Sequence, residues 1–187
     1  MHNKNLKEQF SLIIPHRFDD ERGFFSEIYS VQRYADMGLD IEFVQDNHSL
    51  SHDVGTLRGL HFQAPPHAQG KLVRCGRGAL FDVAVDIRLG SPTFGNWVGH
   101  VLSANNGHQI YVPIGFAHGF VTLEPDSEIV YKCSDYYAAD TEGTVRWNDP
   151  DIAIDWPLTD NLTLNKKDAM APLLKDFESP FIFGKNS

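Results

Sequence analysis

The chain has 187 residues, of which 16 are Lys or Arg and 25 are Asp or Glu, so its formal net charge is -9. This balance argues against nucleic acid or an anionic membrane as a general partner, because binding to a phosphate polymer needs an excess of positive charge. The length predicts one domain over residues 1–187. No apolar run approaches the roughly 20 residues that span a bilayer, and no signal peptide is apparent, so we expect no membrane segment and a cytoplasmic location.

In chain order, the first predicted element is a short helix in VQRYADMGL, ending at Gly38. Residues 72–137 then alternate like strands between turns, and 80–88 (LFDVAVDIR) should be half-buried, with the face of Val83 inward and that of Asp82 outward. Several short strands at hairpin spacing predict an all-β sandwich or barrel. One or two helical turns, interrupted by Pro172, should precede a loosely held tail at 178–187.

The two cysteines, Cys75 and Cys133, each lie in a predicted strand without metal-type spacing, which indicates free buried thiols. A possible metal motif occurs at 113–118, where the P-x-G-x-x-H spacing ending at His118 resembles the second motif of the cupin superfamily. The earlier strand, however, reads His61-Phe62-Gln63, without the second histidine or a following acid. Two imidazoles alone are a poor site for zinc or iron, so we expect no metal.

The stretch GTLRGLHFQAPPHAQGK, residues 55–71, places basic side chains in a predicted strand. His61 could be a hydrogen-bonded core histidine, or a base if a substrate lies against it. The cations of Arg58 and Lys71 suit an oxyanion or phosphate ligand. Arg58 and His61 should face opposite sides of a regular strand, unless a bulge at Gly59 re-aims one of them. Tyr131 should point inward and is a candidate proton donor, although packing alone would also explain it.

Ordered blocks along residues 10–175 resemble the dTDP-4-dehydrorhamnose 3,5-epimerase family. They include RGFFSE, FVQDNHS, GTLRGLHFQ, AQGKLVR, GSPTFGNWVG, PIGFAHGF, YKCSDYY, RWNDPDIAIDWPL and KKDAMAPLL. The resemblance implies a jelly-roll cupin fold with a few short helices, mainly C-terminal. It also implies a dTDP-sugar substrate, no metal or organic cofactor, and a homodimer in which N-terminal strands contribute to the neighbouring subunit.

The resemblance also implies residue roles. His61 is expected to be the general base, Asp168 its partner, Tyr131 the acid on the opposite face of the sugar, and Lys71 the group near the enolate oxygen. The positions where the family contacts sugar, diphosphate or nucleotide are Arg22, Glu27, Gln45, Asp46, Asn47, Arg58, Lys71, His118, Glu142 and Lys167.

Four other functions remain open at this point, one of them a related 4-keto sugar isomerase, which would move the carbonyl. A related epimerase acting at C3 or C5 alone would share His61 and Tyr131. A metal-dependent cupin oxygenase would need a bound metal, and a sugar-binding cupin would lack turnover. The sequence departs from the family pattern only slightly, as at LNKKD, where an acidic residue commonly precedes the Lys-Asp pair. Such changes affect only fine substrate preference.

Overall fold

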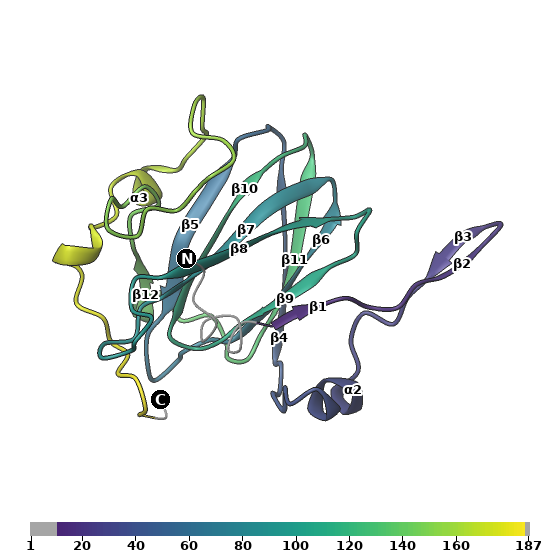
Figure 1. The fold of residues 1–187 in the computed structure, drawn as a ribbon, viewed down its shortest axis with the longest axis horizontal. Helices are drawn as coiled ribbons and strands as arrows, with labels where there is room; N and C mark the ends of the chain where they lie inside the picture. The colour runs from purple at the N-terminus through teal and green to yellow at the C-terminus, as the bar shows by residue number, and fades with distance from the viewer. Residues whose placement is uncertain (1–10, 186–187) are drawn as a thin grey trace.

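The computed structural model describes residues 11–185 as two five-stranded antiparallel sheets packed face to face (Figure 1). Residues 1–10 and 186–187, which include His2 and the end of the predicted tail, lie outside the described range. In spatial order, sheet one contains β1 (Ser11–Ile13), β9 (Gln109–Val112), β6 (Lys71–Arg77), β11 (Ser127–Cys133) and β4 (Gln45–Ser51). Sheet two contains β12 (Glu142–Thr144), β5 (Leu57–Gln63), β10 (Phe116–Thr122), β7 (Ala79–Asp86) and β8 (Trp97–Ser103).

The helices are short, as predicted. Among residues 11–185 the longest helix is α2 (Val31–Asp36), whose N-cap Ser30 accepts from the backbone of Arg33, and Gly38 follows it at a φ of 84°. The other three helices of this described range, η1 (Ala139–Thr141), α3 (Lys166–Ala169) and η2 (Leu174–Asp176), lie in the C-terminal part. The predicted all-β fold class is therefore confirmed. No helix among residues 11–185 is long and apolar enough to cross a membrane.

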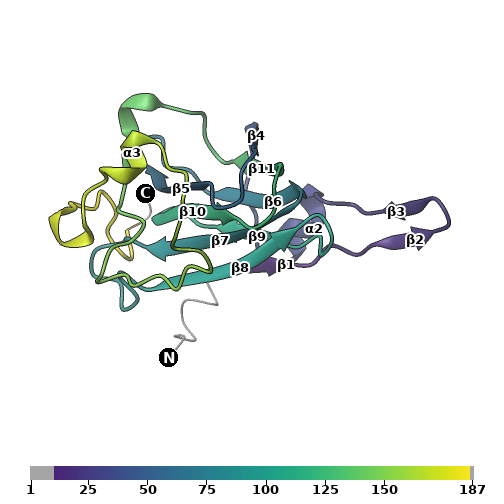
Figure 2. The same cartoon turned by 90° about the horizontal axis from the view of Figure 1, so that it is seen from above.

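A hairpin arm projects from the body of the sandwich, as both views show (Figures 1 and 2). It is formed by β2 (Phe18–Asp20) and β3 (Gly23–Phe25), which pair only with each other. Its phenylalanines are unusually exposed, at 58% for Phe18 and 69% for Phe25. Isolated two-stranded hairpins are marginally stable in water, and the exposed rings of this arm form an apolar patch on it.

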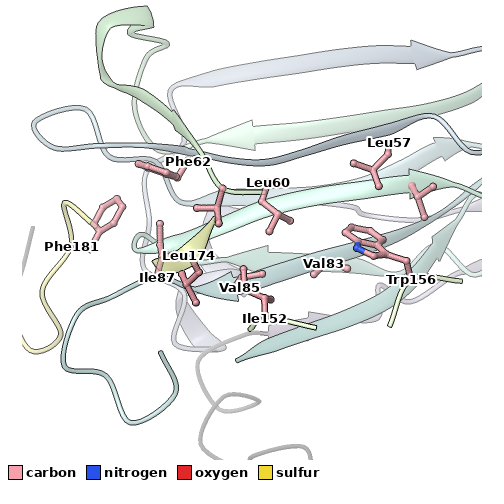
Figure 3. Packing of buried hydrophobic residues seen from close by; sticks show 13 residues of the cluster. Leu57, Leu60, Phe62, Val83, Val85, Ile87, Ile152, Trp156, Leu174 and Phe181 are labelled. Atoms are coloured by element: carbon pink, nitrogen blue, oxygen red, sulfur yellow. The ribbon is translucent and has the colours of Figure 1, made fainter. Parts of the chain in front are cut away.

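The prediction that residues 80–88 form a half-buried strand is wrong, because β7 is buried on both faces. Val83, Val85 and Ile87 pack beneath the C-terminal segment, whose Trp156 and Leu174 cover that side of sheet two (Figure 3). The opposite face points between the sheets. The alternating polarity of β7 therefore reflects polar side chains in the interior between the sheets, and not exposure to solvent.

The prediction of a loose tail at 178–187 is also wrong for the part that the structure describes. Phe181 is 4% exposed and joins the same apolar cluster as Trp156. The backbone of Leu89 donates to Phe181 and accepts from Phe183, so the segment is held as a strand-like extension.

The interior between the sheets is divided. Its apolar half contains Val73, Leu80, Ile110 and Phe116, together with Cys75, and Cys75 and Cys133 are both free and buried, as predicted. The other half carries polar and charged side chains from β4, β5, β6, β7, β10 and β11. This half forms the candidate site.

Candidate active site

A β-bulge in β5 brings Arg58 and His61 to the same side of the sheet. Phe120 pairs with Arg58 and His118 with His61, so two steps along β10 match three along β5. The extra residue lies in the stretch of Gly59, whose φ is 130°. A Cβ at Gly59 would lie 2.6 Å from the Cα of Gly119, so this close approach of two backbones admits only glycine. The expectation that Gly59 could re-aim one of the two side chains is confirmed.

The cavity between β4, β5, β6 and β11 consists of two adjoining compartments, and His61, Lys71 and Tyr131 line both. The cationic compartment is completed by Ser49, Arg58, His118, Phe120 and Ile129. The amide compartment is completed by Gln45, Asn47, Phe62, Gln63, Gln69, Tyr137 and Glu142. The three shared residues therefore stand where a ligand spanning both compartments would pass.

His61 is held by a buried carboxylate. Its Nε2 lies 2.7 Å from Oδ1 of Asp168, and Asp168 is fully buried while the His61 side chain is 28% exposed. Oδ2 of Asp168 accepts the backbone N–H of Gly59 at 3.1 Å, and the Asn165 side chain caps α3 through the N–H of Asp168. Burial raises the pKa of Asp168, but the hydrogen bond and charge of His61 outweigh it, so the pKa stays below its ordinary value.

Tyr131 approaches the cavity from the opposite sheet. It lies on β11, on the same face as Ile129 and Cys133, and Lys71 places its Nζ 5.9 Å from the centre of its ring. Burial raises the pKa of the Tyr131 phenol, which keeps it protonated, and burial lowers the pKa of Lys71. Within residues 11–185, no ion pair joins Lys71 or Arg58 to a carboxylate.

His118 forms a second imidazole–carboxylate pair, deeper in the sandwich. Its Nε2 lies 3.0 and 2.9 Å from the two carboxylate oxygens of Asp82, which is fully buried on β7. His118 is itself 6% exposed and lines the cationic compartment. Burial raises the pKa of Asp82, and the charges of His118 and Lys71 oppose that rise without cancelling it.

A charged pair closes the rim of the amide compartment. Nζ of Lys167, on α3, lies 2.5 Å from Oε2 of Glu142, to which the Tyr137 hydroxyl donates at 3.3 Å. Burial raises the pKa of Glu142, but Lys167 more than reverses this and lowers it overall. Lys167 and Asp168 are thus adjacent on one short helix, with one at the rim and the other beneath His61.

Three predicted binding residues lie away from this cavity within the chain. Asp46 points to the other face of β4, where its carboxylate pairs with Nζ of Lys132 at 3.0 Å. Arg22 lies on the hairpin arm, with a side chain 84% exposed and paired to Asp20, and Glu27 pairs with Arg33 near the base of the arm. One chain alone does not bring these three to the site.

The chain matches the family model described as dTDP-4-dehydrorhamnose 3,5-epimerase over residues 5–176. The chain belongs to this family. It is 54% identical over 164 residues to the dTDP-4-dehydrorhamnose 3,5-epimerase of Salmonella typhimurium, covering 87% of this chain and 89% of that protein. As a member of this family, the protein is an isomerase that acts on sugar nucleotides. Its fold also matches that of its relatives.

Two solved structures bear on the site of this epimerase. A dTDP-6-deoxy-D-glucose-3,5-epimerase from Legionella pneumophila, in complex with dTDP-4-keto-L-rhamnose, superposes with a TM-score of 0.88 at 48% identity and covers 92% of this chain and 91% of its own. A 3'-monoepimerase from Streptomyces bikiniensis, in complex with dTDP-quinovose, gives 0.84 at 36% identity and covers 90% and 85%. The same fold therefore occurs both in a 3,5-epimerase and in a 3'-monoepimerase, two enzymes that invert different numbers of carbons.

Sequence reasoning missed four polar residues that line the epimerase cavity, Ser49, Gln63, Gln69 and Tyr137, and also Asp82 behind it. Asp82 was assigned to solvent because its strand alternates in polarity. Gln63 follows His61 by two positions on β5, so period-two alternation could have placed it on the cavity side. Among residues 11–185, no group of three His, Cys, Asp or Glu side chains is arranged to hold a metal ion.

Proposed function

We propose that this epimerase inverts C3 and C5 of dTDP-4-dehydro-6-deoxy-D-glucose to give dTDP-4-dehydro-L-rhamnose, a step towards dTDP-L-rhamnose. The observation that carries the proposal is the placement of His61 and Tyr131 on opposite sheets of the sandwich, both lining the two compartments. A sugar ring between them meets a base on one face and a phenol on the other. Inversion requires that arrangement, because one group alone would return the proton to the face it left.

In the proposed mechanism, His61 removes the proton at C3 or C5, which is acidified by the adjacent C4 carbonyl. Asp168 holds the imidazole in place and stabilises the imidazolium that forms. The electron pair moves to the C4 oxygen, where the Lys71 ammonium stabilises the enolate. Tyr131, whose pKa is raised by burial, then delivers a proton to the opposite face of the carbon. Proton exchange with water then returns His61 to its neutral form and Tyr131 to its protonated form before the second carbon reacts. Substrate and product have the same oxidation state, so no redox partner takes part.

The rest of the nucleotide sugar needs a longer binding surface than the reacting ring. We propose that Arg58 and His118 in the cationic compartment, and Gln45, Asn47, Glu142 and Lys167 along the amide compartment, contact the sugar, diphosphate and nucleoside. Binding of these remote groups positions the reacting carbon against His61. The cytoplasm is the proposed location, because a charged nucleotide sugar does not cross a membrane unaided.

We further propose that the enzyme works as a homodimer in which the arm of one chain reaches the site of its partner. The exposed phenylalanines of the arm, and the distance of Arg22 and Glu27 from the cavity of their own chain, support this arrangement. Asp46 would then contribute through the outer face of its sheet, beside the base of the arm.

Proton NMR of the product formed in deuterium oxide tests the reaction. Two carbon-bound deuterons, at C3 and C5, are expected. A single deuteron would favour the second candidate function, an epimerase that inverts one carbon. The similarity of the fold to the 3'-monoepimerase is the reason for testing this candidate. No deuteron would contradict epimerase chemistry altogether.

A further inference from the structure

The buried carboxylate of Asp82 has no part in the mechanism described so far. It is 0% exposed, on β7 between β10 and β8 of sheet two, and both of its oxygens lie within 3.0 Å of one ring nitrogen of His118. Burial of a carboxylate costs several kcal/mol even when it is paired, so such a group persists where its charge or its hydrogen bond is used. Its place directly behind the cationic compartment suggests that the use is chemical.

The ionisable groups around this pair come from four further strands. His61 and Arg58 lie on β5, with His61 directly opposite His118 in the sheet register. Lys71 on β6 and His100 on β8 both act on Asp82 through their charges, and His100 is its cross-strand neighbour. Tyr131 on β11, in sheet one, lines the cationic compartment together with His118. Within residues 11–185, two fully buried carboxylates therefore meet these basic groups, Asp168 at His61 and Asp82 at His118.

The hydrogen bond to Asp82 decides which atom of His118 can meet a ligand. Both carboxylate oxygens lie within 3.0 Å of Nε2, so Nδ1 is the ring nitrogen left for the cavity. A net-neutral pair has two forms, a carboxylate with an imidazolium or a carboxylic acid with a neutral ring. In both forms Nδ1 bears a hydrogen. Burial, which raises the pKa of Asp82, disfavours the third, singly negative form, in which Nδ1 would be bare.

We propose that Asp82 is a positioning residue, which keeps His118 as an Nδ1–H donor aimed at the C4 oxygen of the sugar, beside the ammonium of Lys71. This inference rests on the proposed function, because the C4 oxygen gains its charge only in an enolate mechanism. The pair is net neutral, so it adds a fixed donor without adding charge to a cavity that already holds Arg58 and Lys71. A donor fixed before the charge develops needs no reorganisation during the reaction.

The protonation of His118 can be measured directly in the unaltered enzyme. Two-bond proton–nitrogen correlation spectra of protein labelled with 15N-histidine distinguish a protonated from a bare ring nitrogen, and His118→Gln assigns the His118 signals. We expect Nδ1 of His118 to be protonated, both in the free enzyme and with thymidine diphosphate bound. A bare Nδ1 in either state overturns the inference, whatever the activity of any variant.

Kinetics of Asp82→Asn give the second test. Loss of one donor to an oxyanion lowers kcat about 10²-fold or more, so we expect a fall of that size in deuterium incorporation, with thymidine diphosphate affinity within twofold. Asp126→Asn is the matched control, since it alters the exposed His52–Asp126 pair and should leave kcat unchanged. A folded Asp82→Asn variant with near-normal kcat, or with kcat and nucleotide affinity falling together, overturns the inference. Failure of the unaltered enzyme to incorporate deuterium would instead overturn the proposed function.

Discussion

His61 and Asp168, 107 positions apart in the chain, are joined by a 2.7 Å contact between Nε2 and Oδ1. Asp168 is anchored independently of His61, through the N–H of Gly59 and the capping side chain of Asn165. Its geometry is therefore set before any substrate binds. Asp168 is held in place and in turn orients the His61 imidazole. This arrangement is the one expected of an oriented general base.

Replacement of His61, the proposed base, should stop the reaction and spare binding. We expect His61→Ala to lower kcat by roughly 10²–10⁴, the usual contribution of a general base, because the imidazole acts on the sugar carbon. Thymidine diphosphate affinity, measured by calorimetry, should stay close to that of the unaltered enzyme. His52→Ala, on the exposed surface, serves as the control. Near-full activity in His61→Ala would refute its assignment.

Tyr131→Phe should separate the two proton transfers. Without the phenol, His61 can still remove a proton, but the enolate is not reprotonated from the opposite face. We expect inversion to be lost while some deuterium exchange at the starting configuration remains, as followed by NMR. If inverted product still formed at a normal rate, the proton donor would have to be another group.

The Asp168–His61 pair should stabilise the fold in a pH-dependent way. The pKa of Asp168 is lowered in the folded protein from an ordinary value of 3.8, so its contribution is present above that value and is lost as the pH falls below it. We expect Asp168→Asn to lower Tm at pH 7, through a loss of roughly 1–3 kcal/mol, and to lower it less near pH 3. An equal Tm difference at both pH values would contradict this linkage.

The bulge should tolerate no side chain at Gly59. A Cβ there would lie 2.6 Å from Cα of Gly119, at a φ of 130°. We expect Gly59→Ala to cost about 2–5 kcal/mol in unfolding free energy, from backbone strain and overpacking. Gly90→Ala is the matched control, because Gly90 has a φ of 79° but no atom within 4 Å of the added Cβ. Its cost should be only about 1–2 kcal/mol. Comparable losses for both variants would show that the contact with Gly119 is unimportant.

The arm should serve the partner's site. Chains carrying Arg22→Ala and chains carrying His61→Ala are each expected to be impaired when alone. After subunit exchange in an equal mixture, one site of each heterodimer regains both residues, so about a quarter of all sites should be intact. Activity equal to the mean of the separate variants would mean that Arg22 acts within its own chain or not at all.

Alternating polarity predicted the strands and the inward side of Tyr131, and the glycine between Arg58 and His61 pointed to the bulge. Alternation also misled, because a polar face is read as solvent-facing whether it meets water or a polar cavity. Asp82 was misplaced for that reason. The tail was misjudged because its hold depends on backbone bonds to Leu89, on the hydrogen bond from the Ser179 hydroxyl to Ile87 and on the burial of Phe181, which leave no periodic signal.

The pairing of Asp168 with His61 could not be derived from spacing at all. No pattern within a single sequence relates two positions that are 107 residues apart. Family resemblance supplied the assignment, and the structure supplies its geometry. The same holds for the ion pair between Glu142 and Lys167. Glu142 reaches the site because β12 pairs with β5, and Lys167 reaches it from α3.

The proton transfers at C3 and C5 are most directly tested by turnover in deuterium oxide, with proton NMR of the purified product. The mechanism predicts inversion and one solvent deuteron at each of the two carbons with the unaltered enzyme, and neither with His61→Ala. Inverted product that retains its original hydrogen at C3 or C5 would contradict exchange through His61 and Tyr131.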